Sequence, residues 1–166
     1  MNAEKVDRIV YRFTRREIAA LLRLMGAEDL PGTTVKAALP SDQTALSLVE
    51  SGIIMPLGEK TFVDGTISLI MRTACQAKRY LAAKSPAGYV ALYCGEHILV
   101  LIEEPIIGPM KIEPLRNVES AREPWLKAME ELGEEAEAEL IAEGKNVSSE
   151  KGAGASERIY SQFCKG

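Results

Sequence analysis

The chain has very few of the residues that build metal centres and nucleophilic active sites. Among its 166 residues are one histidine and three cysteines. Cys75, Cys94 and Cys164 are 19 and 70 residues apart, a spacing typical of neither a disulfide framework nor a zinc site. The sequence also contains no phosphate-binding glycine loop. We therefore expect no metal, no cofactor and no catalytic residues, and predict that the protein is not an enzyme.

Positive charge and aromatic side chains are scarce as well. Aromatic residues make up 5% of the chain, the formal net charge is −4 and the pI is about 5.2. A nucleic-acid binder derives most of its affinity from basic residues that neutralise phosphates, and single strands are held by stacking on aromatic rings. The composition therefore disfavours nucleic acid as a partner.

Long apolar runs are missing too. No stretch of 18 consecutive apolar residues occurs, and the first residues lack the apolar core of a signal peptide. We therefore expect a cytoplasmic protein that is not inserted in a membrane. The odd number of cysteines agrees with a reducing compartment.

What the chain does contain is enough apolar sequence for one sizeable core. Apolar residues account for 46% and charged residues for 27%, which are ordinary values for a globular domain. We predict one α+β domain over residues 1–143. The segment 144–166 is rich in Ser, Gly, Ala and Lys and is predicted to be a flexible tail, although Ile159–Phe163 offers a short element that can dock.

The N-terminal half predicts helices interrupted by a small hairpin. Val6–Phe13 fits a short strand or a first helical turn, and it leads into the capping box Thr14/Glu17, which begins an amphipathic helix. A second helix begins at Ser41 or Asp42, and its apolar face is formed by Ala45, Leu46, Leu48 and Val49.

Two short apolar strands follow, and then a long helix is expected. Ile53–Met55 and Thr61–Val63 flank a turn and form a hairpin. Asp64 then caps a helix whose apolar residues recur at helical spacing as far as Leu81. The hairpin is either a wing beside a DNA-facing helix or a structural element packed against the main sheet.

The C-terminal half predicts an antiparallel sheet and a further long helix. Tyr89–Cys94 and Ile98–Glu103 form a hairpin around Gly95–His97, and their nearly continuous apolar character predicts a sheet covered on both faces. A third strand covers Lys111–Leu115, with Pro114 at an edge or strand end.

From Glu119 to Glu150 there are ten acidic and three basic residues. Apolar residues spaced as in a helix predict one long helix with an acidic outer face, and they are Trp125, Met129, Leu132, Ala136 and Leu140. Pro124 fits the first turn of such a helix.

This order of elements resembles one half of the EspG family, the cytosolic chaperones of mycobacterial type VII (ESX) secretion. The segments that carry the likeness are Glu17–Leu22, Leu48–Ile54, Phe62–Asp64 leading into Ile67–Ile70, and Tyr89–Tyr93. The likeness covers residues 13–132. The mycobacterial chaperones resemble two such halves in tandem, so the resemblance implies a single half-length version that rebuilds the pair as a homodimer, with the central sheets pairing.

The resemblance implies a protein that binds helical secretion substrates. By analogy, partner contacts involve the turn Gly95, Glu96 and His97 and the C-terminal helix near Trp125 and Met129. Taken alone, His97 is more typical of an exposed turn residue than of a catalyst, and Trp125 more typical of a core anchor than of a binding hot spot.

A second hypothesis is a winged-helix transcriptional regulator with a ligand-sensing or dimerising α/β part. It requires the basic residues of Thr14–Arg23 to face DNA. The segment Ser41–Glu50 contains no Lys or Arg, whereas the helix that enters the major groove normally carries the basic residues.

Overall fold

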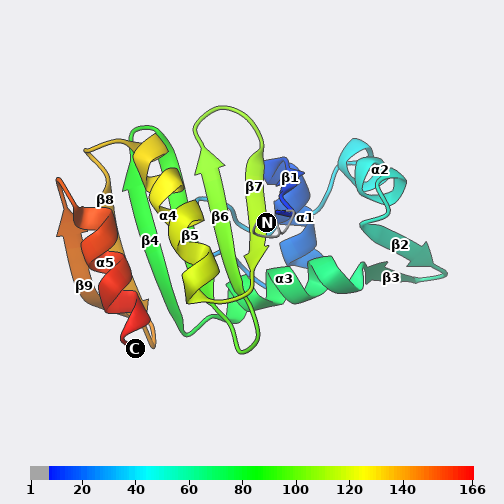
Figure 1. Ribbon diagram of the computed structural model, residues 1–166. Helices are drawn as coiled ribbons and strands as arrows, with labels where there is room; N and C mark the ends of the chain where they lie inside the picture. Colours follow the sequence, from blue (N-terminus) through cyan, green and yellow to red (C-terminus); the bar gives the residue numbers. More distant parts are fainter. Residues whose placement is uncertain (1–7) are drawn as a thin grey trace, which may run out of the picture.

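The computed structural model describes residues 8–166 and consists of one large sheet with helices on both faces (Figure 1). The helices and strands, in chain order, are β1 (Tyr11–Phe13), α1 (Arg15–Leu24), α2 (Asp42–Glu50), β2 (Ile54–Leu57), β3 (Lys60–Val63), α3 (Gly65–Gln76), β4 (Arg79–Ser85), β5 (Gly88–Cys94), β6 (Leu99–Pro105), β7 (Met110–Leu115), α4 (Val118–Leu132), β8 (Glu137–Ala142), β9 (Lys145–Lys151) and α5 (Ala155–Cys164). The α+β class predicted from the sequence is confirmed.

The main sheet has seven antiparallel strands in the order β1-β7-β6-β5-β4-β8-β9. β2 and β3 form a separate two-stranded sheet. Figure 1 shows this hairpin at the end of the molecule farthest from β8 and β9. It is therefore not packed against the main sheet; instead, Ile54 joins the core beside α1 and α2.

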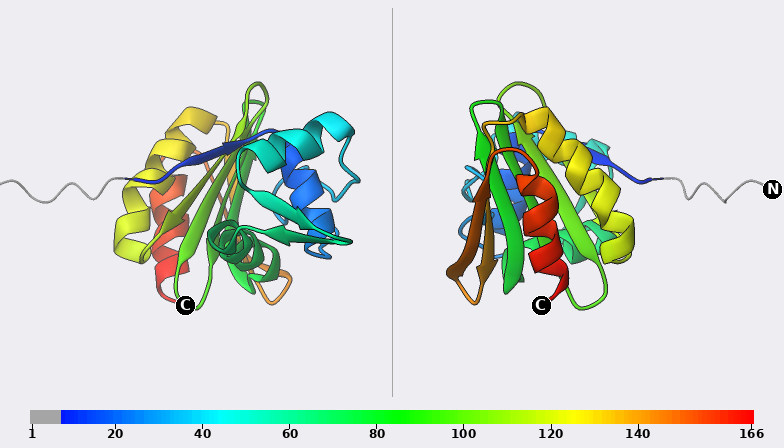
Figure 2. Two further views of the ribbon diagram at one scale, coloured as in Figure 1. Left: turned by 90° about the vertical axis from the view of Figure 1, so that its right-hand side faces the viewer. Right: turned by 60° about the vertical axis from the view of Figure 1, so that its left-hand side comes forward.

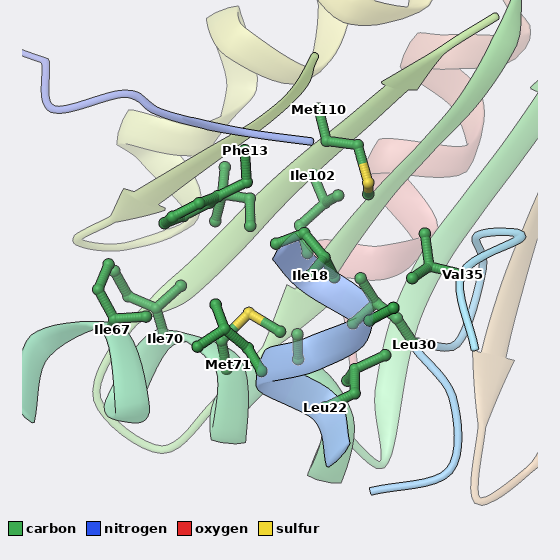
Figure 3. Packing of buried hydrophobic residues seen from close by; sticks show 14 of the residues in the cluster. Phe13, Ile18, Leu22, Leu30, Val35, Ile67, Ile70, Met71, Ile102 and Met110 are labelled. Atoms are coloured by element: carbon green, nitrogen blue, oxygen red, sulfur yellow. The ribbon is translucent and has the colours of Figure 1, made fainter. Parts of the chain in front are cut away.

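Two hydrophobic clusters sandwich the central strands. One lies between the sheet and helices α1 and α3, and Figure 3 shows Ile18, Ile70 and Ile102 from three elements meeting there. The other lies on the opposite face, beneath α4 and α5 (Figure 2). Because β5 and β6 contribute apolar side chains to both clusters, the prediction that they are covered on both faces is confirmed.

The first helix begins where its capping residues predict. The Glu17 backbone N–H donates to the Thr14 hydroxyl, and the Glu17 carboxylate accepts from the Thr14 backbone, so the capping box is present. The preceding strand covers only Tyr11–Phe13, while Val6 and Asp7 lie outside the described residues. Pro114 lies beyond the residues of β7 that pair with β1, as expected for a strand end.

The predicted long helix from Asp64 to Leu81 is wrong in its second half. α3 ends at Gln76, and Ala77 is extended with φ −62° and ψ 125°. β4 then runs in the centre of the sheet, where Leu81 pairs with Leu92 on one side and Leu140 on the other. Small residues such as Ala82 and Ala83 fit both periodicities, so the sequence pattern did not separate helix from strand.

The predicted helix running through Leu140 is also wrong at both ends. α4 begins six residues before Pro124, capped by Asn117, and ends before Gly133, whose φ of 90° favours glycine. Beyond it, Ala138 and Leu140 are buried while Glu137 and Glu139 are exposed, which is the alternation of the strand β8.

The flexible tail predicted over 144–166 is replaced by two ordered elements. β9 pairs along β8, and α5 packs on the sheet. Ile159, Tyr160 and Phe163 are buried in the cluster beneath α4 and α5. The i, i+1, i+4 spacing of these three residues in the sequence is typical of the buried face of a helix. Among residues 8–166, no helix is long and apolar enough to cross a membrane.

Candidate protein-binding surface

Exposed apolar side chains are concentrated in one part of the molecule. Of the twelve large hydrophobic residues that are exposed within residues 8–166, eight lie between residues 24 and 69. These eight are Leu24, Leu39, Leu46, Val49, Met55, Leu57, Phe62 and Leu69. Scattered exposed apolar residues are normal, whereas a contiguous group marks a site of interaction.

The hairpin β2–β3 exposes three apolar side chains on its outward face. Ile54 is buried and Val63, its cross-strand partner, is half-buried, so this pair faces the core. The next pair, Met55 and Phe62, faces the other way because side chains alternate along a strand. Met55, Leu57 and Phe62 are 59%, 57% and 51% exposed. Lys60, which pairs with Leu57, is the one polar residue on this otherwise apolar face, so the face is suited to a partner.

Local capping fixes the hairpin against the helices. The Asp64 backbone N–H donates to the Ile53 carbonyl over 2.8 Å, which closes the base of the hairpin. The Asp64 carboxylate then accepts from the Thr66 and Ile67 backbone N–H groups, both at 3.1 Å, and starts α3. The orientation of the hairpin is thereby coupled to the first turn of α3.

A hollow of about 620 Å³ separates the hairpin from the helices beside it. Its walls come from the end of α1, from β3 and from α3, and include Met25, Phe62, Val63 and Arg72. Figure 2 shows β3 passing close to α1 and α3 at this end of the molecule.

A second hollow, of about 680 Å³, lies on the other side of α3. It is bounded by the end of α3, the start of β4 and the turn between β5 and β6. Arg72 and Gln76 line both hollows, so the exposed side of α3 forms a ridge between them.

We call the whole region the α3 surface. It comprises the outward hairpin face (Met55, Leu57, Phe62), the exposed α3 side chains (Leu69, Arg72, Gln76) and the turn Gly95–His97.

Three of the five residues that the resemblance suggested lie on this surface. Glu96 and His97 have side chains that are 93% and 83% exposed, and Gly95 joins them to the end of β5. A Cβ atom on Gly95 would lie 2.6 Å from Thr73 Cγ2 and 2.8 Å from the Ile98 carbonyl oxygen. Glycine is therefore required for the turn to pack against α3.

The other two suggested residues are not available to a partner. Trp125 is fully buried and Met129 is buried, both beneath α5 on the opposite face of the sheet from α3. The indole N–H of Trp125 donates to the Ser156 carbonyl over 3.1 Å. These two residues are core residues, and the structure does not bring them together with Gly95–His97.

The amphipathic pattern of α2 predicts an apolar face that the structure buries only in part. Of the predicted apolar face of α2, only Leu48 is fully buried, while Leu46 and Val49 are exposed. The alternation of side chains along the two hairpin strands places Met55, Leu57 and Phe62 on one face, with Lys60 as its one polar residue.

The buried carboxylates hold the scaffold together instead of forming a site. Glu104 is 2% exposed and accepts from Arg15 Nε at 2.9 Å and from the Thr34 backbone N–H at 2.8 Å. Glu113 accepts two bonds of 2.6 Å from Arg8. Both buried charges are paired and hydrogen-bonded, as stability requires.

Neither hollow offers an obvious reactive group. Burial raises the pKa of the Cys75 thiol, which lines the first hollow, to about 11, with a smaller contribution from Asp29. The thiol is thus protonated near neutral pH and a poor nucleophile. Within residues 8–166, no three His, Cys, Asp or Glu side chains are grouped so that they can hold a metal ion.

No protein-family model matches the chain, and no curated protein matches it at a significant level.

Proposed function

We propose that the protein is a non-enzymatic adaptor or chaperone of the cytoplasm that holds a helical substrate protein of a type VII-like secretion system. The observation that carries the proposal is the α3 surface, which exposes apolar side chains on a hairpin and on the adjoining helix. The resemblance to the EspG family suggests the secretion system and the client class.

The shape of the surface suits a helix as the bound element. An amphipathic helix binds by placing its apolar side chains into a groove at i, i+3, i+4 and i+7 spacing. The α3 surface offers a hollow of about 620 Å³ between the hairpin and α3, with Met25, Phe62 and Val63 among its lining residues. A helix laid there would contact Phe62, which belongs to the outward hairpin face.

The alternative, a winged-helix regulator, has less support. Arg15, in the basic stretch that would have to face DNA, is bound to the buried Glu104. The hairpin of a DNA-facing wing would normally be strongly basic, but this one exposes Met55, Leu57 and Phe62 beside a single lysine.

The test is co-expression with the small helical proteins encoded beside the gene. We expect one of them to form a complex that survives size-exclusion chromatography and has a defined mass by light scattering. Met55→Ser combined with Phe62→Ser should weaken the complex at least about tenfold, because buried apolar anchors dominate interface energies. Affinity is measured by isothermal titration calorimetry.

A matched control removes exposed apolar side chains elsewhere. Ile107 and Val147 are 89% and 60% exposed and lie outside the α3 surface. Ile107→Ser combined with Val147→Ser should leave affinity unchanged. The proposal fails if no neighbouring helical protein binds, or if only the control variant weakens binding. Retention on heparin with steep salt dependence would favour the regulator.

A further inference from the structure

The hollow between the end of α3 and the β5–β6 turn is basic, although the chain as a whole is acidic. Its lining includes Arg72, Lys78 and Arg79, with Glu96 as its only acidic residue. The formal net charge of the chain is −4. We call this region the basic hollow.

Two of the three cations are free to bind a partner. Arg79 is committed to the fold, because its Nη2 donates to the carbonyls of Gln162 and Phe163 at 3.1 and 3.0 Å. Arg72 and Lys78 are exposed, and neither is in an ion pair with any residue from 8 to 166. Arg72 bonds only to Ser68 on its own helix.

Within the basic hollow, negative charge is too weak to cancel these cations, and the carboxylates Glu28 and Asp29 line only the other hollow that Arg72 borders. The C-terminus of α3 carries a partial charge of about −0.5, which is smaller than the charge of either side chain. Glu96 lies 3.8 Å from His97 and has a side chain that is 93% exposed, so water screens it strongly. The hollow therefore retains a positive potential.

Apolar side chains share the hollow with the cations. Leu69 is 48% exposed at its edge, and Ala77 and Ile98 also line it. A ligand that fits has to satisfy both properties. It needs an apolar stripe for Leu69 and Ile98 and negative charge for Arg72 and Lys78.

We infer that the α3 surface selects an amphipathic helix that carries carboxylates along one edge of its apolar stripe, with those carboxylates placed at Arg72 and Lys78. This inference rests on the proposed function and specifies the chemistry of the client. Arg72 sits on the ridge between the two hollows, so a helix that crosses α3 reaches the hairpin and the basic hollow together.

The apolar lining favours a peptide over nucleic acid. Phosphate backbones are held by extended basic grooves, and bases by aromatic platforms, whereas the described lining of the basic hollow has three cations, no Phe, Tyr or Trp and an exposed leucine. Carboxylates on a helix with apolar neighbours match this lining.

The test uses two synthetic helical peptides of about 18 residues, about five turns, with the same apolar stripe. One carries Glu along the edge of the stripe and the other carries Lys. Binding of the full chain is measured by fluorescence anisotropy at about 20 mM and about 500 mM salt, which brackets strong and weak screening. We expect the Glu peptide to bind about tenfold more tightly at low salt, because each exposed ion pair changes affinity up to a few-fold.

Charge reversal completes the test. Arg72→Glu combined with Lys78→Glu should reverse the preference of the chain between the two peptides. A matched control, Arg16→Glu combined with Lys127→Glu, changes the net charge equally at exposed positions outside the hollow and should keep the preference.

The inference is overturned if both peptides bind equally, if neither binds, or if the control reverses the preference as strongly. It is also overturned if the reversal mainly abolishes binding to a short DNA duplex. These results are separable from failure of the proposed function. A natural client that binds through Met55 and Phe62 and is insensitive to the charge reversal would leave the proposed function standing and remove only the inference.

Discussion

At the scale of single residues, the buried carboxylates Glu104 and Glu113 are paired with arginines. Glu103, by contrast, lies where its charged form is disfavoured. Glu103 lies on β6, facing α4, in a hollow that it shares with Arg8, Lys111, Glu113 and Glu131. Burial raises the pKa of Glu103, and the nearby Glu131 raises it further, while Lys111 opposes both. The folded protein therefore holds a proton on Glu103 more tightly than the unfolded chain does.

This pKa shift predicts a pH-dependent effect of Glu103→Gln. Because the pKa is raised on folding, the stabilising contribution of the protonated acid is present below about pH 4.5 and is lost as pH rises above that value. Glutamine removes the charge, so the variant should melt about 1–2 °C higher than wild type at pH 7 and show little gain at pH 4. Calorimetry at both pH values measures this, and Glu139→Gln, on an exposed strand position, is the control. A gain at pH 4 that matches the gain at pH 7 would contradict the assigned cause.

At the scale of whole elements, α5 is an integral part of the core. Ile159, Tyr160 and Phe163 are buried, and the Tyr160 hydroxyl donates to the Val118 carbonyl. α5 also covers Trp125, whose indole N–H is bonded to Ser156. Without α5, the second hydrophobic cluster would face water.

We therefore predict that a chain ending at Lys151 does not fold cooperatively. Exposing three large buried side chains lowers the free energy of unfolding by about 1.5–3 kcal/mol for each side chain. Their sum approaches the whole free energy of unfolding of a typical domain. Circular dichroism should show no sharp thermal transition, and dye binding should reveal exposed apolar surface. A shortened chain that melts within a few degrees of wild type would instead support the flexible tail predicted from the sequence.

The elements that the sequence predicted correctly are those with explicit start signals. The Thr14/Glu17 box, Ser41 and Asp64 each define a helix start, and the Gly95 turn defines a hairpin. The errors lie where alanine-rich or acidic segments fit both helix and strand. At Arg79–Ser85 and Glu137–Ala142 the chain is extended because both neighbouring strands offer hydrogen bonds, a long-range effect that local patterns do not encode.

The candidate site could be predicted only in part, because its geometry also depends on contacts between segments that are far apart in the sequence. The turn Gly95–His97 was identified, but its position beside α3 depends on how far α3 extends before β4 begins. Trp125 has both a large apolar surface and a polar N–H, properties that suit a core and also an interface. Its burial follows from α5, which lies in a segment that the sequence predicts to be a flexible tail.

At the scale of the molecule, the two ends of the sheet are protected against pairing. β9 carries Lys145 and Lys151 at its ends, and the β8–β9 pairing shifts register between Leu140 and Ile141. The other edge, β1, has only three residues. Charged ends, bulges and short strands are the usual means of blocking edge-to-edge association. The homodimer with pairing sheets, which the resemblance implies, would have to overcome these features.

We therefore predict that any self-association of the free chain uses the α3 surface and not a sheet edge. Because Met55, Leu57 and Phe62 remain exposed, we expect a weak dimer that forms at about 100 μM and above, in keeping with a small apolar contact. Met55→Ser combined with Phe62→Ser should give a monomer, whereas Val147→Asp on β9 should behave as wild type. Light scattering over a concentration series measures both, and a bound helical client should dissociate the dimer because it covers the same residues. A dimer that persists in the hairpin variant and is lost in Val147→Asp would place the contact at the sheet edge and restore the paired-sheet arrangement.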